Sequence, residues 1–205
     1  MIRRLPGLVA LLLWTACLAP RPREMPHLAR AEVAGDFSSY QISRIGILPF
    51  GGAEVGRDMG AVLQQSFQSE LGAATPYELV MLGARDLEEL ERSEPHRRGW
   101  YEPRTIIGLS QRYRLDALLF GTIVQQRPFP PQILSVQVDL VSAETGLVIW
   151  SADVHLDAVD PRVRDGLQLF YEGVRPDENA PEWTIALLSP ERFARFAAYQ
   201  VASLL

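Results

Sequence analysis

The stretch LSVQVDLVSAETGLVIWSADVHL, residues 134–156, decides the fold of this 205-residue chain. Apolar and polar side chains alternate along residues 134–140 and again along residues 148–156. Alternation with a period of two indicates a strand with one buried face, and a short loop that ends at Gly146 joins the two runs. The stretch therefore predicts an antiparallel hairpin.

Strands and helices surround this hairpin on both sides. The spacing of apolar side chains predicts strands at 42–48, 77–82 and 116–126, and helices at 55–71, 86–91, 104–113, 163–170 and 190–204. We expect 77–82 to be a buried strand and 116–126 to be the central one, with Gly121 allowing a neighbour to approach closely. Ser189 and Pro190 suit the N-cap and first position of the last helix. The order predicts the α/β class: a three-layer mixed sheet flanked by helices, with a C-terminal antiparallel hairpin and a closing helix.

The first residues have the pattern of a secretory leader. Residues 1–16, MIRRLPGLVALLLWTA, contain two arginines, an apolar run over 5–14 and a small residue before Cys17. The apolar run is shorter than the ~20 residues that span a bilayer. Cys17 is the single cysteine of the chain, so it cannot form a disulfide within it. We predict a signal peptide at 1–16 and lipidation of Cys17 by fatty acyl chains such as palmitate. The alternative is an ordinary signal peptide followed by an incidental cysteine.

The remaining length suits one compact domain. We predict the lipidated cysteine and a tether at 17–40, followed by a single α/β domain at 41–205. Three prolines and little periodicity over 18–39 are typical of a partly extended tether. A strap that lies on the domain is equally compatible with that stretch.

The charge of the chain argues against nucleic acid as a partner. The formal net charge is -5, and loss of Arg3 and Arg4 with a leader makes it more negative. Proteins that bind nucleic acid need a basic footprint, which this balance does not provide.

The sequence offers little for catalysis, metals or cofactors. His27, His96 and His155 are far apart and have no second cysteine to join them, so we predict no metal site and no cofactor. The glycine-rich residues 50–56 lack the spacing of a phosphate loop and are interpreted as a turn. The acidic residues of 86–94 are expected to form a solvated helix face rather than a catalytic pair. We predict that the chain is not an enzyme. An enzyme whose active site is not recognised in the sequence remains an alternative hypothesis.

Aromatic side chains in irregular segments are the clearer candidates for function. Trp100 and Tyr101 lie in a polar stretch, and Phe129 lies in a cluster of prolines. Such residues either cover the edge of the core or anchor a partner, and both interpretations stay open. Trp100, Tyr101 and Phe129 are our candidate partner contacts.

Three motifs in order carry a resemblance to a known family. They are RIGILPF at 44–50, LDALLFGTI at 115–123, and the hairpin 136–151 with Glu144-Thr145-Gly146 in its turn. The pattern resembles the CsgG-like and TolB amino-terminal-like domains of bacterial envelope lipoproteins, whose relatives include LpoB and PelC, and it covers 41–156. The resemblance implies a three-layer α/β domain that is anchored in the outer membrane and acts by assembly. It transfers no functional residue other than Cys17.

Together these features predict a non-enzymatic, lipid-anchored periplasmic protein that binds a partner in cell-envelope assembly or export. The lipid on Cys17 would hold it on the periplasmic face of the outer membrane, and Leu18 after the cysteine favours that location by analogy with enteric sorting. The partner is either another envelope protein or a second copy of the chain. The alternative is a ring-forming structural subunit of an outer-membrane secretion or polysaccharide-export complex.

Overall fold

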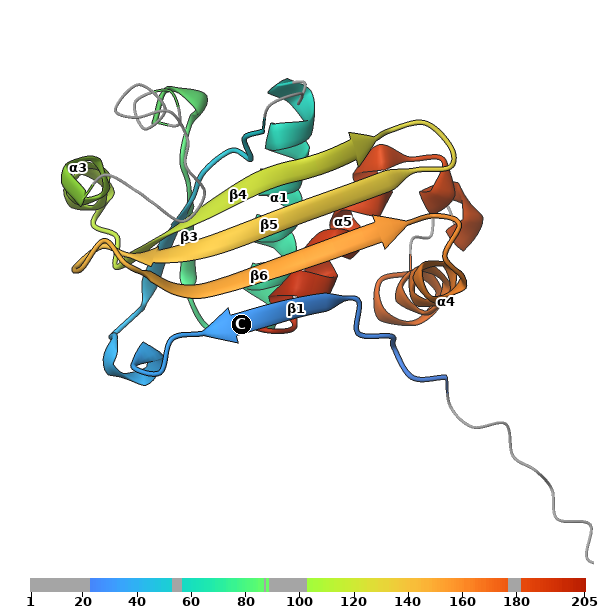
Figure 1. The fold of residues 1–205 in the computed structure, drawn as a ribbon, viewed down its shortest axis with the longest axis horizontal. Helices are drawn as coiled ribbons and strands as arrows, with labels where there is room; N and C mark the ends of the chain where they lie inside the picture. Colours follow the sequence, from blue (N-terminus) through green and yellow to red (C-terminus); the bar gives the residue numbers. More distant parts are fainter. Residues whose placement is uncertain (1–22, 53–56, 87, 89–102, 177–181) are drawn as a thin grey trace, which may run out of the picture.

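A computed structural model describes residues 23–52, 57–86, 88, 103–176 and 182–205 (Figure 1). These residues build a six-stranded sheet in the order β1-β6-β5-β4-β2-β3. The strands are β1 Ala29–Val33, β2 Arg44–Ile47, β3 Glu78–Met81, β4 Ala117–Arg127, β5 Ile133–Ser142 and β6 Val148–Asp157. β2 runs parallel to β3 and to β4, whereas the other pairs are antiparallel, so the sheet is mixed.

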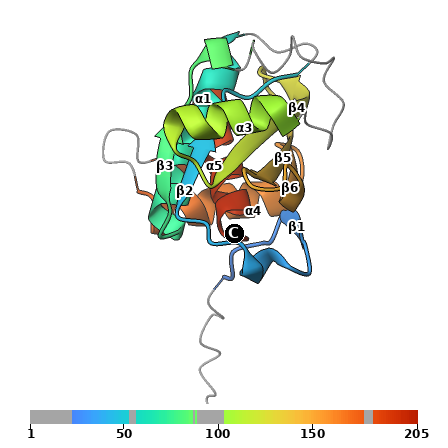
Figure 2. The same ribbon diagram turned by 90° about the vertical axis from the view of Figure 1, so that its left-hand side faces the viewer.

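The helices lie on both faces of this sheet. They are α1 Arg57–Ala74, α3 Pro103–Tyr113, α4 Pro161–Leu169 and α5 Pro190–Ala202, with short turns η1 Phe37–Ser39, η2 Phe170–Val174 and η3 Trp183–Leu187. α1 and α5 cover one face, and α3 crosses one end of the sheet and packs on the other face (Figure 2). The predicted three-layer α/β architecture is confirmed, including the closing helix.

The predicted hairpin is β5 and β6. Val138 pairs with Ala152 in the antiparallel register, and both side chains are buried in the core under α1 and α5. The turn between the strands places Gly146 at a φ of 70°, in the left-handed region that glycine adopts without a steric cost. The alternation of apolar residues therefore identified the strands and the face that each one buries.

β4 is the central strand, as the sequence predicts. Ala117 and Leu119 enter the core under α1 and α5, whereas Leu118 and Phe120 enter a second core under α3. A strand buried on both faces has an apolar sequence without alternation, which explains the continuous run. A Cβ at Gly121 would overlap the ring of Phe50, so the close approach expected there is also confirmed.

The prediction of a buried strand at 77–82 is wrong in one respect. β3 exists, but it is an edge strand that pairs only with β2 in the described sheet. Leu79 and Val80 are half-buried, and Met81 is 38% exposed. Apolar composition predicted the strand correctly but does not distinguish the middle of a sheet from its edge.

The sheet also begins earlier than the boundary at Gln41. β1 pairs with β6 over Ala29–Val33, and the backbone N–H of Leu28 donates to Oε1 of Gln200 on α5 at 3.0 Å. Met25 packs against the core. The part of 17–40 that the structure describes is therefore a strap that lies on the domain. Its single strand alternates apolar and polar residues over only five positions and has small alanines on its buried side, so its periodic signal in the sequence is weak.

Gln64 of α1 joins the helix layer to the parallel strands. It is 6% exposed, and its Nε2 donates to the carbonyls of Ile47 at 2.7 Å and of Leu82 at 2.8 Å. One buried amide thus bonds to the carboxyl ends of both β2 and β3, which fixes α1 along these strands.

Replacing Gln64 by leucine tests this role. We expect Gln64→Leu to lower the free energy of unfolding by about 1–3 kcal/mol, because two buried hydrogen bonds are lost while the volume of the side chain is nearly kept. Urea unfolding followed by circular dichroism measures the change. Gln65→Leu, one residue along on the exposed side of α1, is the matched control and should stay within about 0.5 kcal/mol of the parent chain. Equal effects of the two substitutions would contradict the role of Gln64.

Candidate functional site

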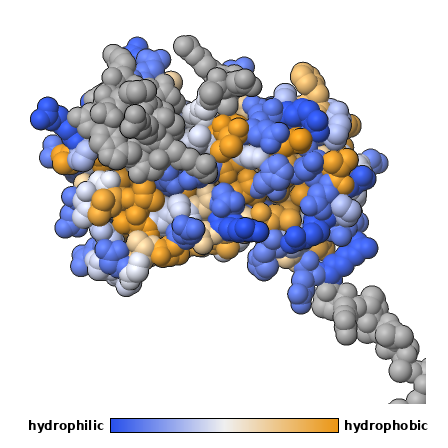
Figure 3. Space-filling view, in the orientation of Figure 1, coloured by the Kyte–Doolittle hydropathy of each residue, from blue (hydrophilic) through white to orange (hydrophobic). Residues whose placement is uncertain are grey.

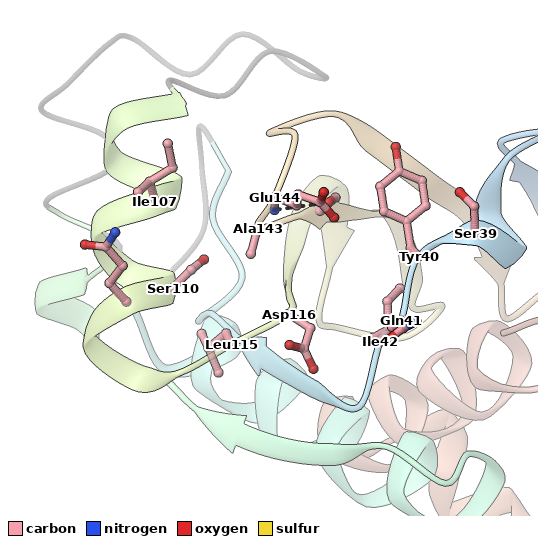
Figure 4. Close-up of a pocket in the computed structure, with 12 residues that line it drawn as sticks. Ser39, Tyr40, Gln41, Ile42, Ile107, Ser110, Leu115, Asp116, Ala143 and Glu144 are labelled. Atoms are coloured by element: carbon pink, nitrogen blue, oxygen red, sulfur yellow. Dashed lines mark hydrogen bonds between the residues drawn. The ribbon is translucent and has the colours of Figure 1, made fainter.

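An open pocket of about 520 Å³ lies at the end of the sheet where β2 and β4 begin (Figure 4). We name it the α3 pocket. Four segments form its walls: Ser39–Ile42 before β2, one side of α3, Leu115–Asp116 before β4, and Ser142–Glu144 in the hairpin turn. The side of α3 that faces the pocket carries Ile107, Ser110 and Gln111.

Asp116 fixes two of these walls. Its Oδ2 accepts hydrogen bonds from the backbone N–H groups of Ser43 and Arg44, each at 2.9 Å. The guanidinium of Arg44 in turn contacts Glu78 at 2.7 Å. A carboxylate that accepts two backbone N–H bonds is held firmly. Asp116 therefore sets the position of the chain that enters β2, while its side chain stays exposed to the pocket.

Ser110 and Glu144 place further polar groups at the pocket. Ser110 is 6% exposed, and its Oγ makes no hydrogen bond within the described protein. Figure 4 shows this hydroxyl directed from α3 toward the pocket. The Oγ of Ser142 accepts from the backbone N–H of Glu144 at 3.2 Å, which shapes the turn and leaves the Glu144 side chain exposed. A buried hydroxyl without a partner is costly, so Ser110 is an unsatisfied polar group in the wall of the pocket.

The charge of the pocket suits a cation. Among the described residues that line it are two carboxylates, those of Asp116 and Glu144, and no basic side chain. Ile107 of α3 is 43% exposed at the pocket. Leu147, in the hairpin turn that also carries Glu144, is 61% exposed. Carboxylates with apolar neighbours bind guanidinium groups well, because the charge is paired and the apolar stem of an arginine is covered.

The predicted site residues do not come together at this pocket. Phe129 lies in the loop between β4 and β5, at the opposite end of the sheet, and is 75% exposed. Cys17, Trp100 and Tyr101 lie outside the described residues. The α3 pocket itself was missed, although two of the motifs behind the family resemblance contribute Asp116 and Glu144 to it. The signal for the pocket that was available in the sequence is the position of these motif residues beside the ends of predicted strands.

The prediction of a solvated helix face at 86–94 is wrong for Asp86. Asp86 is not on a solvated face, because it is only 5% exposed. It accepts from the backbone N–H of Gly83 at 2.9 Å, from Arg112 at 3.0 Å and from the hydroxyl of Tyr113 at 3.2 Å. These bonds attach the end of α3 to the chain that follows β3. The rest of this stretch, apart from residue 88, lies outside the described residues.

The described residues provide no evident metal site. No group of three or more histidine, cysteine, aspartate or glutamate side chains among them is placed to hold an ion. His155 is exposed on the side of the hairpin opposite its apolar face, and its Nδ1 is hydrogen-bonded to Ser135. In the part of the chain that the structure describes, no helix combines the length and the apolar character that a membrane span requires.

A second open cavity, of about 410 Å³, lies between α1 and α5, and the charged residues that line it are Arg192, Arg195 and Glu191. Arg195 donates to the buried carboxylate of Glu70 at 2.8 Å, and Arg175 contacts the same carboxylate at 3.4 Å. Tyr171 packs under Arg192, whose guanidinium lies 4.4 Å from the ring centre. Burial raises the pKa of Tyr171 to about 12, although the charges of Arg192 and Arg195 oppose the shift. These arginines are occupied in joining the helices.

Comparison with known proteins gives only distant likenesses. No family model matches the chain, and no curated protein does. Among solved structures, the PelC dodecamer from Paraburkholderia phytofirmans has a TM-score of 0.46 at 10% identity, covering 82% of this chain and 96% of that one. Lipoprotein GNA1162 from Neisseria meningitidis has a TM-score of 0.40 at 19% identity, covering 56% of this chain and 80% of that one. The LpoB C-terminal domain from Escherichia coli has a TM-score of 0.36 at 12% identity, covering 59% of this chain and 92% of that one.

PelC and LpoB are also the relatives named with the sequence resemblance. Membership of the CsgG-like or TolB amino-terminal-like class stays a prediction. All three TM-scores are below 0.5, so these likenesses carry no conclusion about function.

The raised pKa of Tyr171 can be measured directly. The fold favours the neutral form of the Tyr171 hydroxyl. Tyr171 therefore contributes to the free energy of unfolding below pH ~10, and this contribution is lost as the pH rises toward 12. We expect Tyr171→Phe to remove the highest-pH component of the tyrosinate absorbance rise near 295 nm, with circular dichroism at each pH to show that the chain is folded. Loss of a component near pH 10 instead would contradict the effect of burial.

Proposed function

We propose that the chain is a non-enzymatic, lipid-anchored periplasmic protein that binds a protein partner in cell-envelope assembly or export, on the periplasmic face of the outer membrane. The single observation that carries the partner site is the α3 pocket, a preformed acidic cavity with a buried, unpartnered Ser110 hydroxyl. The leader pattern and the single Cys17 support the anchor.

The partner that suits this pocket presents a basic side chain beside an apolar one. An arginine or lysine would pair with the exposed carboxylates of Asp116 and Glu144. Its apolar neighbour would cover Ile107, which lines the pocket. Trp100 and Tyr101 come shortly before α3 in the sequence, and they remain proposed partner contacts.

The start of the described chain and the pocket lie at opposite ends of the domain. The described chain begins at Arg23 beside α4, where Arg23 donates to Gln168 at 3.3 Å. α3, which lines the pocket, lies at the other end of β4, β5 and β6 (Figure 1). A partner can therefore reach the pocket without displacing the membrane attachment.

The second candidate function is a ring-forming subunit, and the edges of the sheet favour it. β1 and β3 are the two outer strands of the described sheet, and each exposes an apolar side chain, Val33 at 57% and Met81 at 38%. Unpaired strand edges are templates for pairing with another copy. Two different edges would make the head-to-tail contacts that can close a ring. A discrete multimer in light scattering across concentration would favour this candidate over the monomeric adaptor.

The proposed anchor predicts a covalent lipid on Cys17. We expect the chain expressed with its leader to incorporate a labelled fatty acid and to fractionate with membranes. Cys17→Ala should abolish both, because the thioether to the lipid needs the sulfur. Mass spectrometry of the mature N-terminus is the independent readout. A mature chain that begins elsewhere, or an unmodified thiol at Cys17, would refute the anchor.

The acidic pocket predicts where a partner crosslinks. A photo-crosslinking residue in place of Ile107 should give one discrete adduct in cell envelopes, and one in place of Val124, which is 57% exposed on the sheet, should not. Glu144→Arg should reduce the adduct about tenfold or more, equivalent to ~1.4 kcal/mol, because it places a like charge against the partner. Glu172→Arg makes the same charge change away from the pocket and should leave the adduct unchanged. Equal losses from both variants would argue against the pocket.

A further inference from the structure

Large apolar side chains are exposed at the end of the domain that is opposite the α3 pocket. Phe129 is 75% exposed in the loop between β4 and β5, Val159 is 61% exposed in the turn between β6 and α4, and Leu188 is 67% exposed directly after η3. We name these three residues the apolar end. None of them is used by the fold or by the pocket proposed above.

The three segments that carry the apolar end are in contact with one another through Gln132. The backbone N–H of Ala158 donates to the carbonyl of Gln132 at 2.9 Å. The buried side chain of Gln132 lies 3.3 Å from the carbonyl of Ala186 in η3. Pro128 and Pro190 line one small cavity, which joins the β4–β5 loop to the start of α5. Figure 1 shows these segments together at one end of the strands, and Figure 3 shows apolar and charged surface side by side on one broad face.

The chain enters the domain at this same end. Met25 packs against the core, a Cβ on Gly166 of α4 would lie 3.0 Å from Pro26, and Arg162 of α4 donates to the carbonyl of His27 at 3.2 Å. The strap is therefore attached beside α4 before it becomes β1.

The length of chain between the anchor and this attachment is short. The eight positions from Cys17 to Met25 reach at most about 29 Å when fully extended, and ~16 Å on average as a flexible coil. β4 alone, with 11 residues, is about 36 Å long. A lipid on Cys17 therefore keeps the apolar end close to the bilayer and allows the α3 pocket to face away from it.

We propose that the apolar end rests on the lipid bilayer, with Phe129, Val159 and Leu188 entering its interfacial region. This inference rests on the proposed lipid anchor, and it assigns Phe129 to lipid rather than to a protein partner. Both signs of charge flank the segments of the apolar end: Arg127 ends β4 and Asp157 ends β6, whereas Asp160 and Arg162 lie at the start of α4. Apolar burial rather than attraction to anionic headgroups is therefore the source of binding.

A fluorophore at each end of the domain tests the contact. Leu188→Cys and Leu147→Cys are labelled with an environment-sensitive dye in the lipidated chain, in which the sulfur of Cys17 is blocked. Leu147 is 61% exposed at the pocket end and is the matched control. The protein is reconstituted in phosphatidylcholine vesicles that contain a nitroxide-labelled lipid. We expect the label at 188 to shift to shorter wavelength and to be quenched several-fold more than the label at 147.

A second form of the protein separates this inference from the lipidation of Cys17. Six histidines replace Cys17, and vesicles that contain a nickel-chelating lipid hold the chain at the same position. If cells leave Cys17 unmodified but the label at 188 is still shielded in this form, the proposed anchor fails while the apolar end is supported. If the label at 188 is no more shielded than the label at 147, the inference is overturned even where Cys17 carries lipid.

Substitutions within the apolar end are the last part of this experiment. Phe129→Ser together with Val159→Ser should lower the quenching at 188 to near the level at 147. Val33→Ser together with Val124→Ser removes two side chains that are each 57% exposed on other parts of the sheet, and should leave the quenching unchanged. Shielding of the label at 188 in the absence of lipid, rising with protein concentration, would assign this end to a contact between copies and overturn the proposal.

Discussion

The burial of Glu70 between α1 and α5 constrains the helical layer on which the sheet depends. A carboxylate that is 1% exposed is unstable in the core unless cations and donors compensate it. Arg195 of α5 supplies a hydrogen bond at 2.8 Å, and Arg175, just after η2, supplies a second charge at 3.4 Å. Because the pair fixes α5 against α1, it also fixes Gln200, whose side chain accepts from the strap at Leu28. The ion pair of Arg195 with Glu70 thus links the amino-terminal strap to the helices that cover the hairpin.

Much of the architecture could be predicted from the sequence because its elements satisfy local rules. The hairpin followed from strict alternation, and α5 followed from an apolar stripe that begins after Ser189, whose hydroxyl accepts from the N–H of Arg192 at 3.3 Å. What the sequence alone left undetermined depends on contacts between distant residues. The exposure of β3 depends on its place at the edge of the sheet, and β1 exists because β6 offers a free edge. Asp86 is buried by Arg112 and Tyr113, which lie a helix away in sequence.

The α3 pocket shows the same limit for function. Its residues come from four segments that span more than half of the described chain, and each is ordinary in its own context. Asp116 precedes a strand, Glu144 lies in a turn, and Ser110 follows the apolar pattern of a helix. Only the pairing of β4 with β2 and β5, together with the packing of α3, places the three side chains around one cavity. Asp116 also holds the backbone that enters β2, so the acidity of the pocket and the geometry of its wall share one residue.

A strap instead of a long tether changes what an anchored domain of this kind can do. A free tether from Cys17 to Ser39 would let the domain search a large volume, and the local concentration of any one partner would fall accordingly. Because Met25 and Leu28 are attached to the domain, the sheet rather than a long tether would set the distance from a lipid on Cys17 to the pocket. With the proposed anchor, such a pocket would favour a partner that presents its basic side chain at a fixed height above the membrane. The rigidity of β4, β5 and β6 would then become part of the recognition, since these strands separate the end where the strap is attached from the end that carries the pocket.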